Sequence, residues 1–98
     1  MFWRKQETEV ERLQKCVDCY KKYADELSSE YNYWLSKAEA VREAIEKSDG
    51  IERQVLEKRL ERTIETLAKK DAQHENMQER IRETQALLDE QRKVEEKC

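Results

Sequence analysis

The chain has 98 residues, of which 44% are charged and 37% are hydrophobic, and it contains one glycine and no proline. This length allows one small domain, and the scarcity of helix breakers beside abundant Glu, Lys, Arg, Gln, Leu and Ala favours long helices in an all-α fold. The net charge is −3 with both signs interspersed, so we expect no nucleic-acid binding, which needs a cationic stripe facing the phosphates.

No run of the sequence approaches the ~18 apolar residues that cross a membrane, and no signal-peptide core is visible. We therefore expect no membrane span and a cytoplasmic or nuclear location. Three cysteines, Cys16, Cys19 and Cys98, are too few for a disulfide framework.

The first five residues place Phe2 and Trp3 beside Arg4 and Lys5. Such an end could anchor a protein in lipid headgroups, but a single short basic and aromatic segment binds membranes weakly. We therefore assign Trp3 to the start of the helical stripe that follows.

An apolar stripe with heptad spacing predicts a first helix over about residues 3–47. Apolar residues separated alternately by four and three positions lie along one side of a helix and form the seam of a coiled coil. A lone helix with such a stripe is marginal in water, so the stripe must pack against another helix. The predicted interface residues of this helix are Val10, Leu13, Val17, Tyr20, Ala24, Leu27, Tyr31, Trp34, Ala38, Val41 and Ile45.

Tyr23, Tyr33 and Leu35 fall outside the strict stripe and widen the apolar face of this helix. Two interpretations follow. Either a third helix or a partner packs on these residues, or the tyrosines cover the shoulder of the seam with their hydroxyls in water.

Ser48, Asp49 and Gly50 form the one interruption of the pattern and predict a turn. Gly50 is the only glycine, and these three residue types end a helix or cap the next one. Asp49 and Glu52 have the spacing of a capping box. The competing interpretation is a single skipped residue inside one continuous helix.

A second helix is predicted over about residues 51–97, with a weaker and more polar stripe. Its main row is Leu60, Leu67, His74, Ile81 and Leu88. The companion row is either Glu57, Ile64, Asp71, Gln78 and Gln85 or Leu56, Thr63, Lys70, Met77 and Thr84. Ile64 joins the main row in the predicted interface.

Folding the chain at Asp49 brings the two stripes together layer by layer. The opposed pairs are Val10 and Leu88, Val17 and Ile81, Ala24 and His74, Tyr31 and Leu67, and Ala38 and Leu60. We predict an antiparallel two-helix hairpin, over residues 1–98 as one coiled-coil segment, that associates into a dimer or four-helix bundle because two helices alone bury little. The alternative is one continuous parallel dimeric coiled coil.

The sequence offers little for catalysis or cofactor binding. Cys16 and Cys19 form a C-x-x-C pair in mid-helix, whereas a zinc site needs four converging ligands. His74 is the only histidine, so no catalytic triad or metal cluster can be assembled around it. We expect no enzyme activity, no cofactor and no metal, and a redox or zinc clip through the two cysteines is the third alternative.

The predicted function is structural: an oligomerisation coiled coil that acts as a scaffold or dimerisation module of a larger protein or assembly. Self-association is the expected partnership, and other helical proteins are further partners. The alternative is a small accessory subunit that docks an aromatic face onto a cytoskeletal, motor or membrane complex.

Overall fold

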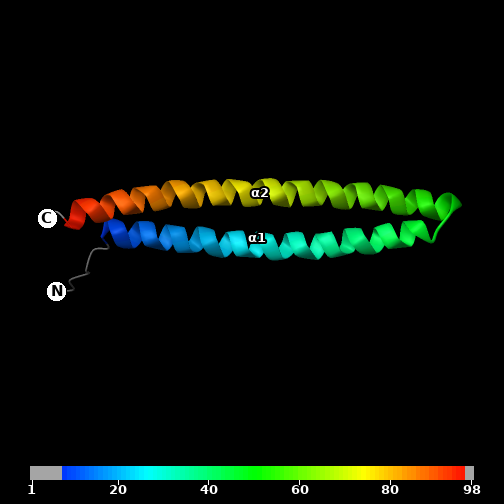
Figure 1. The fold of residues 1–98 in the computed structure, drawn as a ribbon, viewed down its shortest axis with the longest axis horizontal. Helices are drawn as coiled ribbons and strands as arrows, with labels where there is room; N and C mark the ends of the chain where they lie inside the picture. The colour runs from blue at the N-terminus through cyan, green and yellow to red at the C-terminus, as the bar shows by residue number, and fades with distance from the viewer. Residues whose placement is uncertain (1–7, 97–98) are drawn as a thin grey trace, which may run out of the picture. The chain divides into compact units, whose positions relative to one another are not determined.

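The computed structural model describes residues 8–96, which form two α-helices and, within that range, no strand. Helix α1 spans Glu9–Glu46 and helix α2 spans Gly50–Glu96, with a turn at residues 47–49 between them. The chain is an antiparallel helical hairpin (Figure 1). The predicted fold class is therefore confirmed and the continuous parallel rod is wrong, while association between hairpins stays a prediction.

The hairpin divides into two compact units, each of which pairs a segment of α1 with a segment of α2. Unit 1 contains α1 up to Ala24 and α2 from Asn76 onward. Unit 2 contains Asp25–Glu75 and includes the turn.

Helix α1 begins at Glu9 because Thr8 caps it. The Thr8 hydroxyl accepts a hydrogen bond from the backbone N–H of Glu11 at 3.1 Å, and the Thr8 carbonyl accepts one from Arg12 at 3.0 Å. Thr8 and Glu11 have the spacing of a capping box. Helix α1 therefore begins at Glu9. The part of the predicted helix before Thr8, with Trp3 and the rest of the basic and aromatic end, lies outside the described residues.

The turn occurs where Ser48, Asp49 and Gly50 predicted it. The Ser48 hydroxyl donates to the Ala44 carbonyl at 2.8 Å and so satisfies one acceptor at the end of α1. Gly50 has a φ of +63°, a left-handed conformation in which a Cβ would be strained. Asp49 and Glu52 are both described and make no side-chain hydrogen bond, so the predicted capping box does not form.

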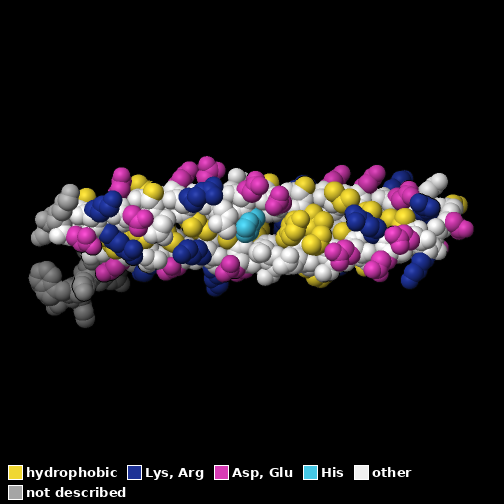
Figure 2. All heavy atoms as spheres, in the orientation of Figure 1, with side chains coloured by type: hydrophobic (Ala, Val, Ile, Leu, Met, Phe, Trp, Pro, Cys, Tyr) yellow, Lys and Arg dark blue, Asp and Glu magenta, His cyan; other side chains and the backbone are white. Residues whose placement is uncertain are grey.

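Buried side chains join the two helices within each unit. Val17 and Leu88 are fully buried in unit 1, and Leu27 and Ala38 are buried in unit 2. Figure 2 shows hydrophobic side chains gathered between the helices, with acidic and basic side chains along the outer rows. The apolar stripe that patterns the sequence is therefore the contact between α1 and α2.

Candidate interaction surface

Most predicted interface residues are only half-buried in the hairpin. The predicted interface residues that are buried are Val17, Ala24, Leu27, Ala38 and Leu88. Two helices cover each other along one side only, so the flanks of a seam stay open to solvent. The half-buried predicted residues are Val10, Leu13, Tyr20, Tyr31, Trp34, Val41, Ile45, Leu60, Leu67, His74 and Ile81.

Ile64 does not lie in the seam as expected. Its side chain is 48% exposed, whereas the neighbouring Thr63 is only 6% exposed. The companion row of α2 is therefore the one that contains Leu56, Thr63 and Met77, all buried or half-buried. Apolar character at residue 64 favoured the wrong row, because a helix of 3.6 residues per turn places residues 63 and 64 on opposite flanks of the row of Leu60.

Two polar contacts join the helices beside the seam. In unit 1, Arg92 Nη2 donates to Gln14 Oε1 at 2.9 Å, and in unit 2, Lys70 Nζ lies 2.6 Å from Glu30 Oε2. The sequence analysis did not identify either pair. Both pairs could have been predicted by folding the sequence at the turn and looking for complementary polar residues that face each other beside the seam.

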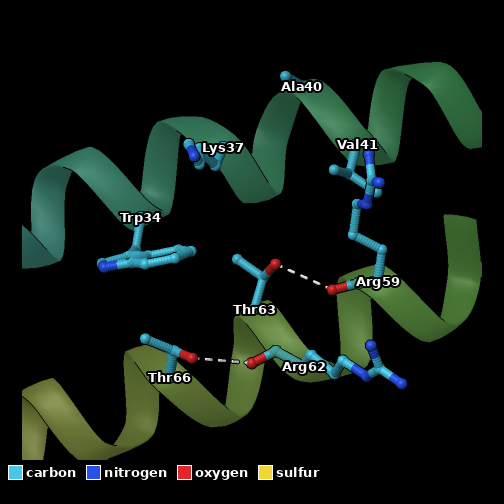
Figure 3. A pocket seen from close by; sticks show the side chains of 8 residues that line it. All are labelled: Trp34, Lys37, Ala40, Val41, Arg59, Arg62, Thr63 and Thr66. Carbon is cyan, nitrogen blue, oxygen red and sulfur yellow. Dashed lines mark hydrogen bonds between the residues drawn. The ribbon is translucent and has the colours of Figure 1, made fainter.

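A groove of about 630 Å³ opens on one flank of the unit 2 seam. The indole of Trp34 projects from α1 toward α2 and forms part of the groove wall (Figure 3). Thr63 and Thr66 donate their hydroxyls to the carbonyls four residues earlier, at 2.9 and 3.0 Å, so these hydroxyls are already satisfied. We call this the Trp34 groove; its lining is Trp34, Lys37, Ala40, Val41, Arg59, Arg62, Thr63 and Thr66.

Cations border the Trp34 groove. Lys37 Nζ lies 4.8 Å from the ring centre of Tyr33 and 5.2 Å from that of Trp34, and the two rings meet edge to face at 5.7 Å. The guanidinium groups of Arg59 and Arg62 form no ion pair with the described residues. A groove with an apolar wall and unpaired cations is suited to an apolar side chain flanked by carboxylates.

The opposite flank of unit 2 holds a smaller cavity, of about 180 Å³, lined by Ser28, Tyr31, Asp71 and His74. His74 is half-buried and makes an interaction of its own. The described residues contain no cluster of three or more His, Cys, Asp or Glu side chains that could hold a metal ion. The cavity therefore offers no constellation that identifies a catalytic centre.

The C-x-x-C pair lies in α1 within unit 1. Cys16 is half-buried, Cys19 is exposed, and both are free thiols. Cys98 lies outside the described residues. A clip between chains through Cys16 and Cys19 stays a prediction.

Comparison with known proteins gives no relative. No protein-family model matches the chain, and no curated protein or solved structure is similar to it. In residues 8–96, neither helix is long and apolar enough to cross a membrane.

Proposed function

We propose that this chain is a structural coiled-coil module that associates with itself and so holds a larger protein or assembly together. The observation that supports this proposal is the imbalance between covered and exposed apolar side chains. Within the described residues, the buried hydrophobic core consists of Val17, Ala24, Leu27, Ala38 and Leu88. Eight large hydrophobic side chains are exposed there: Tyr23, Tyr33, Leu35, Ile51, Val55, Ile64, Leu87 and Val94.

Covering these side chains contributes free energy that favours association. Burying one Val, Leu, Ile or Phe side chain completely contributes about 1.5–3 kcal/mol. Association costs roughly 4–15 kcal/mol in lost translational and rotational freedom. The eight side chains are 38–80% exposed, so each contributes only part of that value. An interface must therefore cover several of them, together with half-buried neighbours, to offset a cost of that size.

Measuring molecular mass against protein concentration tests the proposal. We expect light scattering or sedimentation equilibrium to give masses above the 11.9 kDa of one chain, and these masses should rise with concentration. The temperature of unfolding should rise in parallel, because association stabilises the folded chain by mass action. A single-chain mass with an unchanged unfolding temperature at every concentration contradicts the proposal.

A second candidate function is that of an accessory subunit that docks an aromatic surface onto another complex. The cluster of exposed Tyr33, half-buried Trp34 and exposed Lys37 favours it, since aromatic residues are enriched where partners bind. Leu35 does not extend this cluster, because successive helical residues are turned by about 100° and Leu35 lies on the flank of α1 away from Lys37.

A further inference from the structure

The two flanks of unit 2 differ in shape and in charge. Leu35 of α1 and Ile64 of α2 lie on the flank opposite the Trp34 groove, and both are exposed, at 38% and 48%. The groove places Trp34 near Thr66 and Val41 near Arg59, and the same antiparallel register sets Leu35 level with Ile64. We call these two residues the Leu35–Ile64 ridge.

Acidic side chains surround the ridge. Within unit 2, the rows of Leu35 and Ile64 and the rows on their outer side contain seven carboxylates and one cation, Arg42. Arg53, in the row on the inner side of Ile64, pairs with one of these carboxylates, Glu57, at 3.1 Å. The carboxylates are Asp25, Glu39, Glu46, Glu57, Glu61, Asp71 and Glu75. Figure 2 shows the face on which the histidine is visible, where both acidic and basic side chains border a hydrophobic patch. This flank is therefore an apolar ridge with an acidic border.

The charge pattern excludes pairing of like flanks as the favoured contact. Two Trp34 grooves facing each other would bring Lys37, Arg59 and Arg62 against their own copies. Two ridges facing each other would bring the carboxylates of one chain against those of the other. Like charges placed together across an interface cost several kcal/mol and suppress that arrangement.

We propose that the Trp34 groove of one chain binds the Leu35–Ile64 ridge of a second copy. This proposal rests on the self-association proposed above and names its interface. The ridge supplies two aliphatic side chains for a groove whose volume lies within the roughly 300–1,000 Å³ of typical ligand sites. Its acidic border meets guanidinium groups that have no partner among the described residues of their own chain, so charge-assisted hydrogen bonds can form across the interface.

A contact between unlike surfaces has a consequence for the assembly. A chain that binds a neighbour through its groove still presents a ridge to another neighbour, and the contact therefore repeats. Such heterologous contacts produce rings when the rotation closes and open filaments when it does not. A closed symmetric dimer is not expected from this interface.

Two assembly variants that complement each other test the proposal. The groove variant carries Arg59→Glu and Arg62→Glu, and the ridge variant carries Leu35→Lys and Ile64→Lys. Each variant alone should have the mass of a single chain, with association at least about 100-fold weaker than in the native chain. An equimolar mixture should form a one-to-one complex and stop there, because the groove variant retains its ridge and the ridge variant retains its groove.

Controls separate the interface from general effects of charge. The first control variant, Lys22→Glu with Lys93→Glu, reverses the charge of two exposed cations that lie on neither flank. The second, Ser29→Lys with Ala72→Lys, adds two cations at exposed positions that also lie on neither flank. Both control variants should associate as the native chain does, and circular dichroism should show native helicity for all four. Added salt should weaken the native assembly, because part of the contact is electrostatic.

The outcomes distinguish this interface from the proposed function. If the native chain and either assembly variant associate equally, self-association stands and this interface is wrong. If the two assembly variants fail to combine on mixing, the groove and the ridge are not partners. If the native chain keeps a single-chain mass throughout, the proposed function itself fails, and the groove is then open to an acidic helix of another protein.

Discussion

Gly50 is the residue at which backbone conformation limits the choice of amino acid most strongly. Its φ is +63°, and a Cβ built on it would have no atom within 4 Å. Space is therefore not the constraint. The constraint is the left-handed backbone conformation, in which the Cβ of an L-residue lies too close to the following carbonyl oxygen, at a cost of roughly 1–2 kcal/mol.

Replacing Gly50 with alanine should lower the free energy of unfolding by about 1–2 kcal/mol. For a domain of this length, a change of about 1 kcal/mol lowers the unfolding temperature by roughly 4–8 °C. Thermal unfolding followed by circular dichroism at one fixed concentration measures this change. Gly50→Asn is the matched control and should cost less, because Asn enters the left-handed region more readily than Ala. Equal unfolding temperatures for Gly50→Ala and the native chain would contradict this account of the turn.

At the scale of the elements, the sequence predicted where the helices lie better than it predicted which side of each helix is buried. The heptad stripe of α1 needs no structure to be recognised, because Val17, Leu27 and their neighbours repeat in one phase. In α2, two companion rows were available, and only packing against α1 separated the buried Thr63 from the exposed Ile64. A hydroxyl that bonds to its own helix can occupy such a position, so hydrophobicity alone misleads there.

The start of α1 shows a second limit of periodicity. The stripe could be extended back to Trp3, yet Thr8 caps the helix and Glu9 is its first residue. Cap chemistry fixes a helix end through individual hydrogen bonds, whereas hydrophobic spacing fixes only the face that is buried. The Thr8 and Glu11 pair was present in the sequence and would have predicted this boundary.

The same substitution at two adjacent leucines of α2 tests which face packs. Leu88 is fully buried and Leu87 is 55% exposed. Leu88→Ala should lower the free energy of unfolding by about 2–5 kcal/mol, because it leaves a cavity in the seam. Leu87→Ala should change it by no more than about 0.5 kcal/mol. Both changes alter helix propensity equally, so their difference measures packing.

Urea unfolding at concentrations where the protein is a single chain gives both values. Measurement in that range matters because association could cover Leu87 and hide its exposure. Equal losses for the two variants would contradict the register of α2 described above.

At the scale of the whole chain, the turn and the similar lengths of the two predicted helices were enough to predict the hairpin. The Trp34 groove was not predictable in the same way. Its lining comes from residues of α1 and α2 that are adjacent only after the companion row of α2 has been chosen, and the sequence left that choice open. The unpaired state of Arg59 and Arg62 likewise depends on which side chains reach them in the folded chain.

The exposed tyrosines separate the two candidate functions. Tyr23 and Tyr33 are 43% and 56% exposed, and neither lines the Trp34 groove. If copies of the chain associate through the Trp34 groove and the Leu35–Ile64 ridge, Tyr23→Ala with Tyr33→Ala should leave the concentration dependence of its mass unchanged. The free energy of unfolding should fall by only about 0.5–1.5 kcal/mol, because the Tyr33 ring loses its edge contact with Trp34. If the chain is an accessory subunit, the same double change should abolish binding to its partner.

Tyr31→Ala is the control for this double variant, because Tyr31 is half-buried beside the seam and its loss should destabilise the hairpin directly. Light scattering on all three proteins at matched concentrations gives the result. Should the double variant fall to a single-chain mass while keeping native helicity, the tyrosines belong to the interface between copies. The groove and the ridge would then not account for assembly by themselves, since a contact confined to those two surfaces leaves both tyrosines in solvent.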